Sequence, residues 1–199
     1  MNSLERNAAV IVKALQDNGY TAYLAGGCVR DLIMGVQPHD FDIATNAKPE
    51  QVIGLFKSTI GVGKSFGVIK VKIENDWFEV ATFRTDGFYA DRRHPESVEF
   101  SDAETDARRR DFTINALFYD PISSVFHDFV DGRKDIEHRV VRCVGSPQKR
   151  FGEDPLRMLR AVRFSGKLEF NIEKETQNAI KENAPAITAV SQERIRDEL

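Results

Sequence analysis

Two aspartates stand one residue apart in Asp40-Phe41-Asp42, inside an apolar segment that predicts a strand over residues 39–45. Because successive side chains of a strand point to opposite faces, Asp40 and Asp42 would share one face and Phe41 and Ile43 the other. Two neighbouring carboxylates repel each other unless a cation lies between them, and Mg²⁺ binds a few carboxylates together with substrate phosphates. The pair predicts a seat for a metal-bound nucleoside triphosphate, although D-x-D also occurs in surface turns.

A double glycine, Gly26-Gly27, separates a predicted strand that starts at residue 21 from a predicted helix over residues 28–35. Glycine lets the backbone approach a ligand closely, and a helix N-terminus favours an anion. Arg30, in the first turn of that helix, could donate to the same phosphate. The glycines alone could simply make a tight turn, but their combination with Arg30 and the aspartates favours a triphosphate site.

Glu79 is a candidate third acidic group. It lies in a predicted strand over residues 77–83, which would form a hairpin with the alternating strand at residues 67–73. Alternation places Glu79 on the same face as Trp77 and Ala81, a face that we expect in the core. A carboxylate there would deprotonate a hydroxyl or bind metal; the alternative is an edge-strand charge that faces solvent.

A first basic cluster, Arg109, Arg110 and Asp111, comes directly before the apolar run of residues 112–118. Arginine offers planar bidentate donors to phosphates, and Asp111 could orient one of the two arginines. The alternative is a surface basic cluster beside a helix-capping aspartate.

The segment EDPLRMLRAVRF, residues 153–164, predicts a helix with proline in its first turn and acidic residues at its positive end. A polar stripe along this helix repeats every three residues and consists of Asp154, Arg157, Arg160 and Arg163. A parallel apolar stripe would pack the helix against the protein and consists of Leu156, Leu159 and Val162. Aspartate accepts hydrogen bonds and arginine donates them, so the polar stripe is suited to bind the edge of a nucleobase.

The elements around these motifs predict an α+β fold. Apolar periodicity indicates a helix over residues 4–18 and a second one, with proline in its first turn, near residues 48–56. Residues 86–107 are polar and weakly periodic, which indicates a long connection with a short strand at residues 97–100.

The helical segments gather in the last quarter of the chain, after Gly145-Ser146-Pro147. We therefore expect a mixed α/β domain over residues 1–145 and a helical domain over residues 146–199. The last predicted helix stops at Leu199 without a capping signal, so we expect the chain to be part of a longer protein.

The composition, 41% hydrophobic and 30% charged residues, is that of a soluble globular protein. No signal peptide or membrane-spanning run is recognisable, so we expect no membrane association and a cytoplasmic location. Cys28 and Cys143 match no metal or disulfide spacing. The net charge of −3 neither requires nor excludes a nucleic-acid partner, and the oligomeric state stays open.

Four motifs together, GGCVRD with DFD, EVATFRTDG, RRDFTINAL and EDPLRMLRAVRF, resemble the family of class II tRNA nucleotidyltransferases and bacterial poly(A) polymerases. The resemblance covers essentially the whole chain, and QERIRDEL at residues 192–199 is similar to the neck-helix motif of this family. It implies a polymerase-beta-like nucleotidyltransferase head, with a mixed or antiparallel sheet and helices, followed by an all-helical neck.

The resemblance also implies roles for the candidate residues. Asp40 and Asp42 would bind catalytic Mg²⁺, while Glu79 stays a candidate third acidic group from its strand position alone. The triphosphate would be held at Gly26, Gly27, Arg30 and Arg110, with Asp111 beside them. Asp154 and Arg157 would pair with the base of CTP or ATP, and Arg160 and Arg163 would support that helix and contact the nucleotide. The 3′-terminal hydroxyl of a tRNA would attack the α-phosphate and release pyrophosphate.

Members of the family add CCA, CC only, A only or a poly(A) tail. Residues 85–108 resemble a full-length flexible loop, which argues against CC-only addition. Residues 61–71, GVGKSFGVIKV, lack the G-[RK]-R-[FY] segment typical of bacterial poly(A) polymerases, which favours tRNA as the substrate. CCA addition and A addition stay unresolved, and a non-catalytic nucleotide-binding module is a further alternative.

Overall fold

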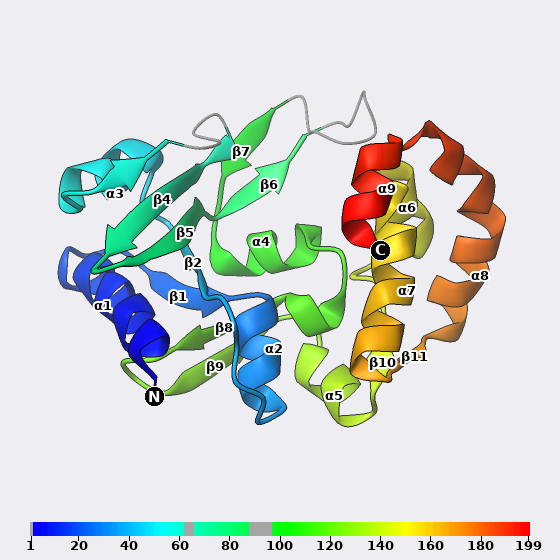
Figure 1. Cartoon of the computed structure of the whole chain (residues 1–199), viewed down its shortest axis with the longest axis horizontal. Coiled ribbons are helices and arrows are strands. Elements are labelled where there is room, and N and C mark those ends of the chain that lie inside the picture. Colours follow the sequence, from blue (N-terminus) through cyan, green and yellow to red (C-terminus); the bar gives the residue numbers. More distant parts are fainter. Residues whose placement is uncertain (1, 62–65, 88–96) are drawn as a thin grey trace.

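The computed structural model describes residues 2–61, 66–87 and 97–199. Figure 1 shows a β-sheet on one side of the molecule and a group of helices from the last part of the chain on the other. The helices are α1 (Ser3–Asp17), α2 (Gly27–Ile33), α3 (Pro49–Leu55), α4 (Ala103–Arg109), α5 (Gly132–Glu137), α6 (Pro147–Glu153), α7 (Leu156–Leu168), α8 (Lys174–Asn183) and α9 (Gln192–Glu198), with short 3-10 helices η2 (Thr113–Asn115) and η3 (Ala184–Ala189). The strands are β1 (Ala22–Ala25), β2 (Asp42–Thr45), β3 (Thr59–Ile60), β4 (Val68–Ile73), β5 (Asp76–Thr82), β6 (Arg84–Asp86), β7 (Val98–Phe100), β8 (Leu117–Asp120), β9 (Val125–Asp128), β10 (Val140–Val141) and β11 (Asn171–Ile172).

The main sheet has seven strands in the order β3-β4-β5-β2-β1-β8-β9. Within the described residues its neighbouring strands pair antiparallel, except for β2 and β5, which are parallel. This mixed sheet confirms the predicted α+β fold class. Asp42 is the first residue of the central strand β2 and pairs with Ala25 at the end of β1, so the sheet brings the aspartate next to the glycine turn.

One face of the sheet is packed by α1, whose side chains Ile11, Val12 and Leu15 are fully buried with Leu24 and Ile43 of the sheet. The stripe matches the apolar periodicity of residues 4–18, and Asn18 caps the helix C-terminus before Gly19. The predicted helix is therefore confirmed. On the opposite face of β2, Ala44 belongs to a second buried cluster with Phe83 and Phe118, so polar groups are left to the start of the strand at Asp42.

The helical part after residue 145 shares its core with the sheet. Phe164 of α7 and Phe170 belong to the same buried cluster as the α1 and sheet residues. The strand β11 also pairs in parallel with β10, where Val140 lies opposite Asn171. The expected all-helical segment therefore contains one two-residue strand, and the division at residue 145 stays a prediction.

The polar connection at residues 86–107 contains more structure than expected. The short strand at its end is confirmed as β7, which pairs with β6. The helix α4 was not predicted, although Asp102 accepts a hydrogen bond from the Thr105 amide at 2.8 Å as an N-cap. Residues 88–96 and 62–65, on which the loop-length and poly(A) arguments partly depend, lie outside the described residues.

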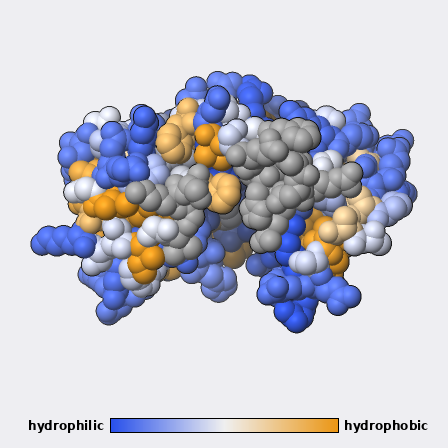
Figure 2. Space-filling view, turned by 90° about the horizontal axis from the view of Figure 1, so that it is seen from above, coloured by the Kyte–Doolittle hydropathy of each residue, from blue (hydrophilic) through white to orange (hydrophobic). Residues whose placement is uncertain are grey.

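Figure 2 shows a mostly hydrophilic face on which hydrophobic residues form small separate patches. In the part of the chain that the structure describes, none of the helices is long and apolar enough to cross a membrane. Cys28 and Cys143 are both free thiols and both buried.

Candidate active site

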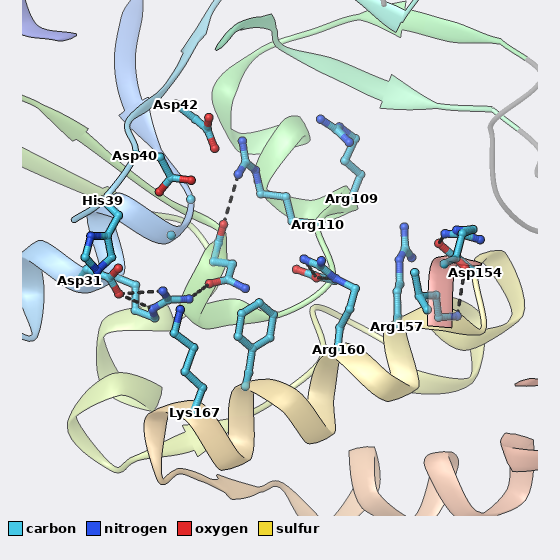
Figure 3. A pocket seen from close by; sticks show the side chains of 18 residues that line it. Asp31, His39, Asp40, Asp42, Arg109, Arg110, Asp154, Arg157, Arg160 and Lys167 are labelled. Atoms are coloured by element: carbon cyan, nitrogen blue, oxygen red, sulfur yellow. Dashed lines mark hydrogen bonds and ion pairs between the residues drawn. The ribbon is translucent and has the colours of Figure 1, made fainter. Parts of the chain in front are cut away.

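A cavity of about 750 Å³ lies between α2, the segment before β2, the α4–η2 connection, α7 and α9. Ten of the predicted site residues line it, namely Gly26, Gly27, Arg30, Asp40, Asp42, Arg110, Asp111, Asp154, Arg157 and Arg160. Eight further residues complete the lining, namely Asp31, His39, Arg109, Asn115, Leu156, Phe164, Lys167 and Arg194. Figure 3 shows Asp40 and Asp42 at one end of this space and Asp154 with Arg157 at the other.

The glycine turn makes room for guanidinium groups. Gly26 has φ +79° and ψ −133°, a conformation that only glycine adopts without strain. A Cβ atom at Gly26 would lie 3.3 Å from Nη1 of Arg110, and one at Gly27 would lie 3.6 Å from Nη2 of Arg30. The glycines therefore do more than form a turn, because they let two arginines approach the backbone at the start of α2.

Arg30 is held rigidly at this turn and is only 5% exposed. Its Nε and Nη2 donate to Oδ1 of Asp31 at 2.8 and 2.7 Å, and its Nη1 donates to Oδ1 of Asn115 at 2.7 Å. Its guanidinium also lies over the Phe164 ring, 5.5 Å from the centroid. Since these bonds use three of five N–H donors, Arg30 keeps donors for an anion in the cavity.

Asp40 and Asp42 both point into the cavity toward the guanidinium of Arg110 (Figure 3). The strand begins only at Asp42, so Asp40 lies in the segment before it and not within the predicted strand. The pKa of Asp42 is raised to about 6, because the surrounding protein desolvates its carboxylate and because Asp40 and Glu79 add negative charge, while Arg110 acts in the opposite direction. The site therefore concentrates negative charge at a point where a cation would relieve it.

Glu79 lies on β5 beside this acidic pair, one residue before the Ile43–Val80 pair that joins β5 to β2. The expectation that its face belongs to the core is wrong, since Trp77 is 44% exposed and the buried face of β5 carries Phe78 and Val80 instead. Glu79 forms an ion pair with Lys70 at 3.3 Å. It lies outside the cavity lining that the described residues form and acts on Asp42 through its charge.

Asp111 orients an arginine, but not one of its neighbours in the sequence. Its Oδ2 accepts a hydrogen bond from Nε of Arg160 at 2.8 Å, and its Oδ1 accepts one from the Phe112 amide at 2.8 Å. Arg110 is instead paired with Asp106 of α4, at 3.0 and 3.1 Å. The role of Asp106, which is 1% exposed, was not predicted because its helix was taken for a loop.

The predicted helix at residues 153–164 is confirmed as α7, with Pro155 at its N-cap. α6 ends at Glu153 and α7 begins at Leu156, so Asp154 lies between them, next to Pro155. Its Oδ1 accepts a hydrogen bond from the Leu156 amide at 3.0 Å. Arg157 is paired with Glu153. The non-helical segment between α6 and α7 places Asp154 at the N-terminus of α7, where its carboxylate can face a ligand.

Arg163 turns away from the cavity toward α9, where its Nε lies 2.6 Å from Oε1 of Glu198. In a helix of 3.6 residues per turn, a three-residue spacing falls about 60° short of a full turn at each step, so the stripe drifts around the helix. The predicted apolar stripe fails for the same reason, since Val162 is 51% exposed. The buried side of α7 carries Leu156, Met158, Ala161 and Phe164.

Some lining residues were not among the predicted site residues. Asn115 orients Arg30, Lys167 closes the cavity at the Arg30 end, and Arg194 enters it from α9. Arg194 lies in the QERIRDEL segment, which the sequence analysis identified as a motif, but its contact with Asp154 was not predicted.

The mixed sheet, the glycine turn and the paired aspartates define a nucleotidyltransferase head of the polymerase-beta-like type. The Poly A polymerase head domain family matches residues 22–142, and the chain belongs to this family. A second match, to the "Probable RNA and SrmB- binding site of polymerase A", covers residues 169–199. The region between the two matches, residues 143–168, contains α6 and α7.

Curated relatives bear the name CCA-adding enzyme. The one from Geobacillus stearothermophilus is 45% identical over 195 residues, which is 98% of this chain and 48% of the relative. The one from Staphylococcus aureus (strain MRSA252) is 43% identical over 198 residues, 99% of this chain and 49% of the relative. The chain thus spans about half the length of the curated relatives that it matches.

Solved structures give the same result. The crystal structure of the Bacillus stearothermophilus CCA-adding enzyme in complex with CTP has a TM-score of 0.91 and 42% identity, covering 100% of this chain and 48% of that chain. A CCA-adding enzyme in complex with ATP has a TM-score of 0.79 and 25% identity, covering 100% of this chain and 46% of that chain. The predicted family membership is confirmed.

Proposed function

We propose that this chain is the catalytic part of an enzyme that adds C, A or both to the 3′ end of tRNA from CTP and ATP, without a nucleic-acid template. The observation that carries the proposal is one cavity with a carboxylate pair and arginines at one end and an aspartate–arginine pair at the other. That arrangement suits a nucleoside triphosphate, whose phosphates need arginine donors and a cation held by carboxylates, and whose base needs one acceptor and one donor side by side. The relatives named CCA-adding enzyme support this choice among polymerase reactions.

The triphosphate would lie against the glycine turn. Gly26 and Gly27 allow the backbone to come close, while Arg30 and Arg110 are fixed by Asn115 and Asp106 and donate from two directions. Donors held in place before binding lose little entropy when the anion arrives. Charge-assisted bonds of this kind are about twice as strong as neutral ones.

Mg²⁺ fits the residues at the Asp42 end. Asp40 and Asp42 supply hard oxygen ligands; the pKa of Asp42 is raised first by desolvation of its carboxylate and second by the negative charges of Asp40 and Glu79, which a bound cation would offset. In the part of the chain that the structure describes, no group of three or more His, Cys, Asp or Glu side chains is arranged to hold a metal. Two carboxylates, phosphates and water are a normal ligand set for Mg²⁺, which would stabilise the charge of the attacking and leaving oxygens.

The base would lie against α7. The carboxylate of Asp154 can accept from an exocyclic amine, and Arg157 can donate to a ring nitrogen or carbonyl. Arg160, fixed by Asp111, would support this end of the site. A well-oriented bidentate contact discriminates between bases by about 1–3 kcal/mol. Arg163 would support the base-binding residues indirectly, because it pairs with Glu198, which also lies 3.6 Å from Arg160.

In the reaction, the oxygen of the tRNA 3′-hydroxyl forms a bond to the α-phosphorus, and the bond from that phosphorus to the bridging oxygen breaks. Pyrophosphate leaves, and the hydroxyl proton passes to solvent or to a carboxylate. Arg30 and Arg110 would hold the leaving phosphates, and Glu79 would add to the negative field around Asp42. Positioning and charge stabilisation supply most of the rate in such transfers.

Addition of CCA or of A is favoured over addition of CC alone by the length of residues 85–108, and tRNA is favoured over general RNA by residues 61–71. We also propose a cytoplasmic site of action, in keeping with the proposed tRNA substrate. A poly(A) polymerase and a non-catalytic binding module are the alternatives.

One experiment separates these functions. The protein is incubated with a tRNA that ends before CCA, and with one that ends in CC, and each of the four nucleotides is supplied separately. Incorporation of C into the first and A into the second supports CCA addition, while A incorporation alone identifies an A-adding enzyme. A long A tail on unrelated RNA contradicts the proposal, as does transfer that survives in Asp42→Ala.

A further inference from the structure

The cationic side chains that line the cavity differ in how they are paired. Each arginine of the lining has a carboxylate partner among the described residues: Arg30 with Asp31, Arg109 and Arg110 with Asp106, Arg157 with Glu153, Arg160 with Asp111, and Arg194 with Asp154. Lys167 also lines the cavity, but no ion pair or hydrogen bond joins its ammonium group to another of the described residues. Its charge is therefore available to an anionic ligand without displacing a carboxylate.

The position of Lys167 on α7 places it next to Arg30. Lys167 follows Phe164 by three residues, and residues three apart on a helix are neighbours on its surface. The guanidinium of Arg30 lies over the Phe164 ring, 5.5 Å from its centroid. Figure 3 shows the Lys167 side chain pointing from α7 toward Asp31, the carboxylate partner of Arg30. Lys167 therefore adds a positive charge to the end of the cavity where Arg30 lies.

Asp154 and Lys167 lie at opposite ends of α7. Asp154 comes just before the helix, and Lys167 is in its last turn. Because an α-helix rises about 1.5 Å per residue, the first and last turns of α7 are roughly 15 Å apart. An extended nucleoside triphosphate has a length of the same order. A nucleotide whose base contacts Asp154 would therefore bring its terminal phosphates, rather than its sugar, to Lys167.

The ammonium group of Lys167 suits a phosphate that moves. Arg30 is 5% exposed and is held by hydrogen bonds to Asp31 and Asn115, so it binds a phosphate in one position. Lys167 is exposed and carries its charge on a flexible four-carbon chain. When the bond from the α-phosphorus to the bridging oxygen breaks, that oxygen keeps the electron pair and the pyrophosphate gains negative charge. A mobile ammonium group can follow the pyrophosphate as it leaves.

We propose that Lys167 is a phosphate-binding residue that contacts the terminal phosphates of the bound nucleotide and the pyrophosphate that the transfer releases. This inference rests on the proposed function, because it assumes that a triphosphate occupies the glycine-turn end of the cavity. A purely structural role would be different, since a lysine in the last turn of a helix stabilises the carbonyl groups of its C-terminus. Loss of the charge would then change the stability of the helix and leave phosphate binding as it was.

The test varies the number of phosphates in the ligand. Binding of CMP, CTP and inorganic pyrophosphate, each with Mg²⁺, is titrated for the full chain and for Lys167→Ala. We expect CTP and pyrophosphate to bind about 5-fold more weakly to the variant, at the upper end of the range for an ion pair that reaches solvent. CMP should bind as before, and the preference for CTP over UTP should be unchanged, because Lys167 lies far from Asp154.

Three further variants make the test specific. Lys167→Arg keeps the charge and should retain most of the affinity for pyrophosphate, whereas Lys167→Glu should lose more affinity than Lys167→Ala, because like charges repel. Lys181→Ala is the matched control, since Lys181 is also exposed, lies in the last turn of α8 and is outside the cavity lining. It should change the melting temperature about as much as Lys167→Ala and leave the binding of all three ligands unchanged.

Two results would overturn the inference. One is unchanged affinity for CTP and pyrophosphate in Lys167→Ala. The other is weaker binding of a tRNA that ends in CC together with unchanged binding of pyrophosphate, because the ammonium group would then contact the RNA backbone. The proposed function fails differently: the unchanged chain would bind CTP and UTP equally, or Asp42→Ala would still transfer nucleotides.

Discussion

At the Asp42 end of the cavity the polar groups are set by the sheet and the glycine turn, whereas at the Asp154 end they are set by ion pairs between helices. Arg30 and Arg110 are fixed by Asn115 and Asp106, beside a glycine turn where a Cβ atom at Gly26 would lie 3.3 Å from Arg110. Asp154 and Arg160 depend on Asp111, which follows α4, and on Arg194 and Glu198, which both lie on α9. The Asp42 end is suited to the triphosphate, which all nucleotides share, and the Asp154 end to the base, which differs between nucleotides.

The largest effect should come from the end that the sheet builds. We expect Asp42→Asn to lower nucleotide transfer by at least about 100-fold, because it removes a charge from the site where charge develops in the reaction. Binding of CTP without a divalent cation should be unchanged or tighter, since one negative charge is gone. Single-turnover transfer and equilibrium binding measure the two quantities, and transfer at the original rate would contradict the assignment.

At the other end, Asp154→Ala should reduce the preference for CTP and ATP over UTP and GTP about 10-fold. Transfer itself should persist, because the phosphate-binding groups lie at the opposite end of the cavity. Competition between pairs of nucleotides measures the preference directly. A variant that loses triphosphate binding but keeps its selectivity would reverse the assignment of the two ends.

The glycine turn offers a matched pair of variants. Gly26→Ala places a side chain at φ +79° and 3.3 Å from Arg110, so we expect a loss of about 1–3 kcal/mol in the free energy of unfolding together with weaker triphosphate binding. Gly27→Ala has no positive φ and a 3.6 Å approach to Arg30, so its effect should be smaller. Chemical denaturation and phosphate titration compare them, and equal effects would show that room for Arg110 is unimportant.

The smallest effect concerns pH. Because the pKa of Asp42 is raised in the folded state to about 6, the folded protein binds the proton more tightly than the unfolded chain. Without divalent cations, this group favours folding below about pH 4 and loses that contribution as pH rises through about 6. The change should be about 1 kcal/mol or less, because the carboxylate reaches solvent, and it should vanish in Asp42→Asn. Denaturation at pH 4 to 7 measures it.

The sequence predicted the local parts of the site well. The glycine turn, the aspartate pair and α1 could be predicted from spacing and periodicity, because the residues that determine each of them lie close together in the sequence. The contact of Asp111 with Arg160, and that of Asp154 with Arg194, could not be predicted, because nothing in either segment specifies which distant arginine folds against it.

Errors in the prediction have a common physical cause. The exposed Val162 was assigned to the apolar stripe because a three-residue spacing was extended along α7, around which such a stripe drifts. The exposed face of β5 was misjudged because alternation identifies two faces but not which one α1 covers. Helix α4 was missed because its polar residues are buried as ion-pair partners rather than as an apolar stripe.

The parallel pairing of β2 with β5 has a consequence for how the chain acquires its site. β2 cannot complete its hydrogen bonds until the chain has passed through α3, β3 and β4, and β1 must also wait for β8. Such non-local pairings form slowly, because the entropy of closing long loops is lost before the contacts are gained. We therefore expect helices to form before the nucleotide-binding site. After dilution from denaturant, CTP binding should recover more slowly than the circular-dichroism signal of the helices.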